Sequence, residues 1–274
     1  IVGTIDNLQE KLSGETPVTR LELIHLVNSW ERTFAFVLKD SNDNIIDIEK
    51  EKSKECYDLS KLNVSEITDM SSIFRSSNFN GDISNWNTSN VTDMQSIFFN
   101  TKEFNSSLNL WDVSKVTNMS EMFYFAKEFN SPLNSWDVSN VTDMFDMFSN
   151  AEKFNQPLDK WKTSNVIDME KMFNNAINFN QDISSWDVSK VTNMNFMFLN
   201  TEVFNQNLNN WNTSNVKYMC GMFCQSDNFN GDISNWDVSS VVDMSKMFYA
   251  AKEFNSPLNS WDVSNVTDMF DMFS

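Results

Sequence analysis

Tryptophan recurs at one fixed interval through most of this chain. Eight tryptophans stand 25 residues apart, at Trp86, Trp111, Trp136, Trp161, Trp186, Trp211, Trp236 and Trp261. A constant period of this size is typical of chains that fold as stacked repeats, because a single unit cannot bury its own apolar face. The spacing predicts a solenoid of about eight to nine repeats over residues 61–274, with the last repeat cut short at Ser274.

The apolar residues hold constant positions, written here as offsets after each Trp. Met at +8, Ile or Met at +11, Phe at +12, a small residue at +15 and Phe at +18 follow helical spacing. They predict a short helix that begins after an Asp such as Asp93 or Asp143. The segment Leu133-x-x-Trp136-x-Val138 alternates as a strand does. We therefore expect an α/β repeat solenoid, with short parallel strands on one face and short helices on the other.

An asparagine occupies position +19 of every complete copy, from Asn80 to Asn255. Amides stacked above one another can satisfy backbone groups at a turn, so we interpret this column as structural. The copies are close in sequence, and residues 127–149 recur unchanged at 252–274. Sameness between copies therefore does not by itself indicate function.

Charge and composition exclude several classes. A net charge of −18 argues against binding to nucleic-acid phosphates or anionic lipid. No stretch approaches the roughly 20 apolar residues of a membrane span. Three cysteines form no disulfide framework, and we interpret Cys220 and Cys224 as two buried or half-buried thiols on one helix face. We expect no cofactor and no metal, and a monomeric protein.

The sequence also argues against an enzyme. His25 is the only histidine and has no nucleophile motif near it, and the chain has no glycine-rich phosphate loop. Near-identical copies offer no distinct environments that would separate the pKa values of two carboxyl groups. The Thr column at +6 is interrupted by Ile167, Lys217 and Val242, so a regular ice-binding array is excluded as well.

Residues 1–60 lack the repeat and are predicted to form a cap over its first coil. We expect a helix over Thr19–Trp30 and two strands, Thr33–Leu38 and Ile45–Ile48, joined as a hairpin. Asp40, Asn42, Asn44 and Glu51 fit part of a calcium-loop template. Ile45 stands where that template needs Gly, so a polar hairpin turn is the better interpretation.

The repeat Trp-Asp-Val-Ser-Asn-Val-Thr-Asp-Met-x-x-Met-Phe resembles that of the BspA-like leucine-rich-repeat surface proteins. The resemblance covers about residues 61–274. It implies a leucine-rich-repeat-like, right-handed superhelix and a secreted or cell-surface location. It also implies a role in adhesion, with a protein partner on another cell or a host.

In a leucine-rich-repeat horseshoe, the outward residues of the strands form one continuous face, here at positions −1, +1 and +3. At +1 the column is rich in carboxylates, and Lys160 and Lys162 interrupt it. We therefore predict an acidic face for protein binding. Its candidate residues are Asp112, Asp137, Lys160, Lys162, Asp187, Asp237 and Asp262. Two alternatives stay open: a structural spacer without a specific ligand, and a solenoid stabilised by calcium bound between coils.

Overall fold

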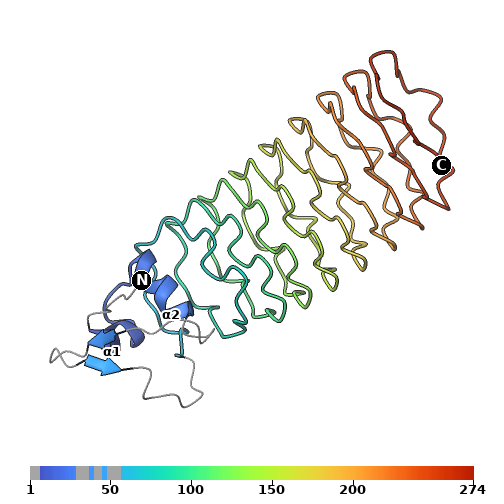
Figure 1. The fold of residues 1–274 in the computed structure, drawn as a ribbon. Coiled ribbons are helices and arrows are strands. Elements are labelled where there is room, and N and C mark those ends of the chain that lie inside the picture. The colour runs from blue at the N-terminus through green and yellow to red at the C-terminus, as the bar shows by residue number, and fades with distance from the viewer. Residues whose placement is uncertain (1–6, 29–36, 40–44, 48–56) are drawn as a thin grey trace.

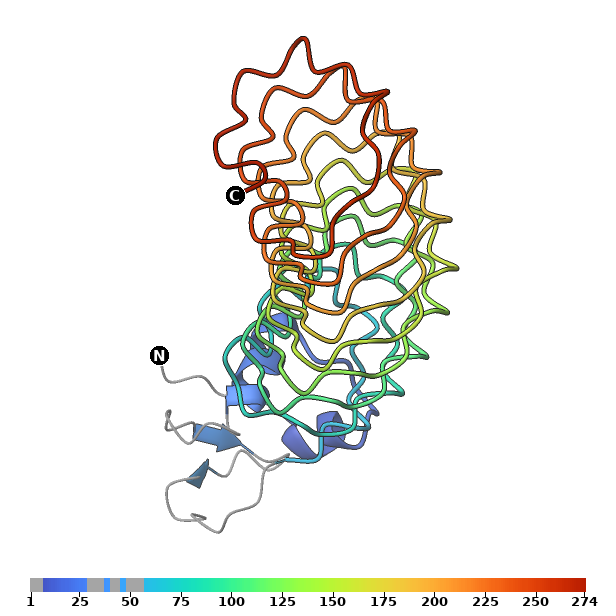
Figure 2. The ribbon, with the colours of Figure 1, turned by 90° about the vertical axis from the view of Figure 1, so that its right-hand side faces the viewer.

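The computed structural model describes residues 7–28, 37–39, 45–47 and 57–274. From residue 57 onward the chain winds in coils that stack along one axis, each on the one before (Figure 1). The turned view shows the coils as a curved stack, with the N-terminal helices at one end (Figure 2). Trp30, Cys56 and the calcium-template residues Asp40, Asn42, Asn44 and Glu51 lie outside the described residues.

The predicted helices and strands of the repeat are absent, so the α/β, leucine-rich-repeat-like fold class is wrong. Residues 57–274 contain neither a helix nor an extended strand. Within these residues the β-bridges between neighbouring coils are isolated parallel ones at position +7, such as that between Asn118 and Asp143. The rest of each coil is a series of turns and connecting segments.

Hydrogen bonding across coils explains why no helix forms over the Met and Phe positions. The amide groups of Met119, Glu121 and Phe123 donate to carbonyls 24 residues ahead, in the next coil, over 2.7–3.0 Å. The intervening amides of Met122 and Tyr124 donate three residues back, as in a turn. A helix would keep all these donors within the coil and leave adjacent coils unpaired.

Left-handed backbone makes the same segment incompatible with a helix. The residues at +10 and +14 have φ between 53° and 59° in copy after copy, including Glu121 and Phe125. The predicted strand fails for a related reason. The Trp136 amide donates to the Leu133 carbonyl over 3.1 Å, which closes a turn where the alternation predicts extended chain.

The burial prediction is confirmed although the secondary structure is not. Met119, Met122, Phe123, Ala126 and Phe129, the predicted inner stripe, are fully buried. Phe123 stacks on Phe129 within its coil at 4.0 Å between ring centroids, and on the equivalent Phe148 of the next coil at 5.5 Å. These columns of rings run through one continuous core.

Two polar columns fasten the coils at fixed positions. Each +19 asparagine accepts, through Oδ1, the backbone N–H of the asparagine 25 residues later, for example Asn155 to Asn130 at 2.9 Å. This column runs without a gap from Asn80 to Asn255. Each buried Trp indole donates to a carbonyl of the preceding coil, as Trp136 does to Leu108 at 3.0 Å. The structural interpretation of the asparagines is confirmed.

Among the described residues before the coils there are four short elements. They are α1 (Leu8–Leu12), α2 (Arg20–Asn28), β1 (Val37–Lys39) and β2 (Ile45–Asp47). The two strands pair antiparallel, with Leu38 opposite Ile46. Leu8, Leu23, Leu26 and Val27 are buried in the same core as the first coils.

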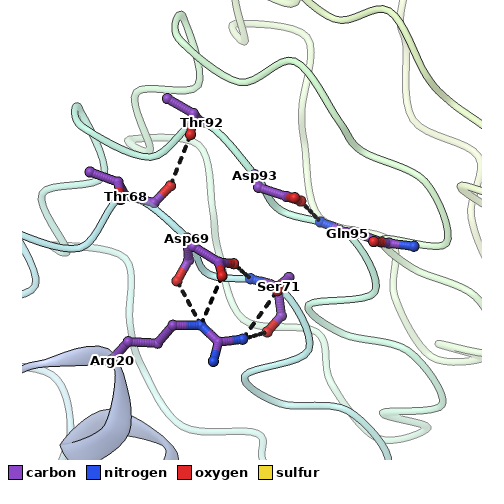
Figure 3. A network of polar contacts seen from close by, with 7 residues as sticks. All are labelled: Arg20, Thr68, Asp69, Ser71, Thr92, Asp93 and Gln95. Carbon is purple, nitrogen blue, oxygen red and sulfur yellow. Dashed lines mark hydrogen bonds and ion pairs between the residues drawn. The ribbon is translucent and has the colours of Figure 1, made fainter.

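Arg20 at the start of α2 closes the N-terminal end of the stack (Figure 3). In the second coil, the carbonyls of Asp93 and Gln95 accept backbone N–H groups from the coil before, at 2.9 Å each. The equivalent carbonyls of the first coil belong to Asp69 and Ser71. They accept instead from Arg20, through Nε at 3.1 Å and Nη2 at 2.6 Å. One guanidinium thus replaces the amide donors of a preceding coil. The division of the chain into a cap of residues 1–60 and a repeat region of residues 61–274 stays a prediction.

Candidate binding surfaces

The predicted acidic column lies on the surface. Its members are all exposed: Asp112, Asp137, Lys160, Lys162, Asp187, Asp237 and Asp262. They do not lie on strands, so the reason given for their outward direction is wrong although the direction is right. Turns that repeat every 25 residues place them one above another.

Each +1 carboxylate has a local structural task. Asp112 Oδ1 accepts the backbone N–H of Ser114 at 3.0 Å, and Asp187 and Asp262 hold Ser189 and Ser264 at the same distance. This is the Asx turn, in which a short side chain completes the turn that follows it. Asn87 and Asn212 make the same bond at 3.2 Å. The Asp-x-Ser spacing is the signal of this turn in the sequence.

The same hydrogen bonds keep the column ionised. Side-chain and backbone hydrogen bonds from Ser114 lower the pKa of Asp112. Asp137 has a lowered pKa through Ser139, with a further contribution from nearby Lys162. Like charges also act along the column, because Asp262 opposes part of the lowering at Asp237. The result is a row of exposed carboxylates that stay charged well below neutral pH.

A second surface was missed by the sequence interpretation. Most residues at positions +9, +10, +13 and +14 are half-buried or exposed, between the buried positions +8, +11, +12 and +15. We call these four columns the variable strip, because their residues differ from copy to copy while most of the coil repeats. Half-buried rings gather there: Phe99, Tyr124, Phe125, Phe145, Phe196 and Tyr249. A helix with the predicted inner stripe would also turn these four positions away from the core, because they lie on its opposite face.

The variable strip contains an unusual carboxyl group. Asp146, at +10, is 6% exposed, and its Oδ1 has no hydrogen-bond partner. Burial raises the pKa of Asp146 to about 6, and Glu121 and Glu170 add to the rise while Lys171 opposes it. Its backbone φ of 53° is one that non-glycine residues adopt at a cost of about 1 kcal/mol.

The two described cysteines, Cys220 and Cys224, form no disulfide with each other. Cys220 is half-buried and Cys224 is buried, both as free thiols, which confirms how the sequence was interpreted apart from the helix. Burial raises the pKa of both thiols. Within the described ranges, no group of three or more His, Cys, Asp or Glu side chains converges as metal ligands would.

Stacked 25-residue coils, joined by backbone bonds and asparagine and tryptophan columns, define a tandem-repeat protein. Three overlapping stretches, residues 46–158, 132–223 and 205–274, match the family described as "Mycoplasma protein of unknown function, DUF285". The chain belongs to that family. A comparison with curated proteins found no match. Among the helices that the structure describes, none has the length and apolar character needed to cross a bilayer.

Proposed function

We propose that this protein is a non-enzymatic, surface-displayed or secreted binding protein whose acidic column recognises a basic protein partner. The observation that carries the proposal is the row of exposed, ionised carboxylates Asp112, Asp137, Asp187, Asp237 and Asp262. Regularly spaced charges of one sign raise the local concentration of a partner of the opposite sign and speed its association. The resemblance of the repeat to BspA-like surface proteins supports the extracellular location and an adhesive role.

Turn formation alone does not require these charges. Asn87 and Asn212 complete the same turn without one. A spacer could therefore use Asn throughout, whereas five of the eight copies carry Asp. The column also breaks at Lys162, where the turn bond is lost in favour of a cation beside Asp137. Both facts favour a binding role for the charge pattern over a purely structural one.

The copies with Asn at position +1 show which substitution tests the proposal. Changing the five aspartates to Asn removes their charge and keeps the turns. Retention of the purified chain on intact cells, measured by flow cytometry, should fall about tenfold. Reversing Lys160 and Lys162 to Glu extends the column and should raise retention. Equal retention of wild type and the Asn variant would overturn the proposal and favour a spacer, provided that both melt at the same temperature.

A calcium titration tests the remaining alternative. An ion that binds only the folded chain raises its melting temperature. If calcium bridges the column, millimolar calcium stabilises the wild type and has no effect on the Asn variant. A shift of equal size in both proteins would place any bound calcium elsewhere.

A further inference from the structure

The +10 column of the variable strip carries side chains that its backbone does not favour. All residues of this column have a left-handed φ, which glycine adopts without steric cost and asparagine adopts more readily than most other residues. In the neighbouring +14 column, four of the eight residues are Asn, at positions 100, 150, 175 and 200. The +10 column contains no Asn, and Glu121, Lys171 and Phe196 stand there at φ of 55–57°. Gly221 is its only glycine. These larger side chains therefore contribute something that the coil alone does not need.

What they build is a repeated arrangement of ring, cation and carboxylate. The Arg75 guanidinium lies 3.6 Å from the centroid of the Phe99 ring and 3.6 Å from Glu121. Lys171 Nζ lies 5.4 Å from the Phe145 centroid and 6.0 Å from that of Phe196. It also pairs with Glu170 at 3.0 Å. In both places an aromatic ring and an acid together hold a cation.

Between these two arrangements lies a carboxyl group with one oxygen atom that has no hydrogen-bond partner. Asp146 stands between Glu121 and Lys171 in the +10 column, and its Oδ1 lacks a partner. Burial raises the pKa of the Tyr124 hydroxyl, and the charges of Asp146 and Glu121 add to the rise. A buried carboxylate oxygen without a partner is unfavourable, so the coil does not satisfy every polar group beneath this part of the strip.

The ring geometry points to a protein rather than a glycan. Phe99 and Tyr124 stack at 4.6 Å with planes 15° apart, so each ring covers one face of the other, and the Arg75 guanidinium lies over the Phe99 ring at 3.6 Å. Phe99 therefore has no open face for a partner. Sugar rings need an open aromatic face. Aromatic and arginine side chains are also the residues enriched at the centres of protein interfaces. The charge of −18 favours a basic partner over an acidic one.

We propose that the variable strip between Arg75 and Phe196 is a second recognition surface. It binds a segment of a partner protein whose Lys or Arg side chains alternate with apolar ones. It shares with the proposed function the assumption of a protein partner, but it uses none of the residues of the acidic column. The two surfaces can therefore fail separately.

Selection of a random peptide library on the immobilised chain tests the strip. The strip variant combines Tyr124→Ser, Phe145→Ser and Phe196→Ser, and the control is the Asp→Asn variant of the acidic column. Enriched peptides should carry Lys or Arg beside apolar residues. Fluorescence anisotropy should show about tenfold weaker binding to the strip variant and unchanged binding to the control.

Lys171→Met supplies a readout that does not depend on the strip variant's folding. It vacates the site over Phe145 and Phe196, so a partner's cation no longer competes with an internal one, and affinity should rise several-fold. A purely structural strip would show no gain. The proposal is overturned if no peptide is enriched, if the enriched peptides are acidic, or if their binding ignores both strip changes. Loss of binding in the control alone would support the acidic column and overturn the strip.

Discussion

The duplicated segment allows one side chain to be tested in two environments. Phe148 and Phe273 occupy the same place in the identical stretches 127–149 and 252–274. Phe148 is fully buried and contacts four rings, those of Phe123, Phe154, Phe173 and Trp161, at 4.0–6.2 Å. Phe273 is 64% exposed and stacks only on Phe248, at 5.5 Å, among the ring contacts described. Any difference between them arises from the coils around them.

The expected magnitudes follow from burial. Truncating a buried Phe to Ala removes its transfer free energy and leaves a cavity, which together cost roughly 3–5 kcal/mol. Phe273 keeps only about a third of its surface away from water and leaves no enclosed cavity, so its truncation should cost about 1 kcal/mol or less. Phe148→Ala should therefore lower the free energy of unfolding by about 2–4 kcal/mol more than Phe273→Ala.

Urea unfolding followed by tryptophan fluorescence measures this difference, with midpoints and slopes fitted for both variants. Met147 and Met272 form the control pair, because both are buried, at 0% and 8% exposure. Truncating either methionine to Ala should cost roughly 2–5 kcal/mol, so this pair should differ less than the Phe pair. Equal losses for Phe148→Ala and Phe273→Ala would refute the idea that stacking between coils supplies the stability.

Three further changes test individual contacts. Arg20→Ala leaves the carbonyls of Asp69 and Ser71 without these donors, so it should lower the free energy of unfolding by roughly 1–3 kcal/mol and lower the melting temperature. Arg75→Ala, on the surface, should lower both by less. Asp146→Asn should stabilise the protein by on the order of 1–2 kcal/mol at neutral pH. Because the folded pKa of about 6 exceeds the ordinary 3.8, the wild type's relative stability is greatest below pH 3.8 and declines as pH rises towards about 6. The urea midpoints of the wild type and of Asp146→Asn should therefore converge at low pH. A difference between the two midpoints that does not change with pH would show that ionisation of Asp146 is not its cause. Lys162→Asp restores the missing Asx turn, so it should raise the free energy of unfolding by about 0.5–1 kcal/mol and raise the thermal midpoint. Lys160→Asp should change neither.

Much of the candidate surface could be predicted from repetition alone. The period placed Asp112, Asp137 and their equivalents in one column, and the apolar pattern showed that they face outward. Their hydrogen bonds to serine were within reach of the sequence through the Asp-x-Ser spacing. The variable strip was within reach as well, because a helix with the predicted inner stripe presents +9, +10, +13 and +14 on its opposite face. The sequence did not indicate the left-handed backbone that the +10 and +14 columns adopt.

The sequence by itself determined which side chains are buried. A 25-residue period with Met, Phe, Leu and Trp at constant offsets permits one inner face, and each coil buries that face whatever its backbone does. Only the tertiary structure decided the backbone. Turns replace helices because alternate amides find acceptors in the next coil, and that coil exists only once the chain has stacked.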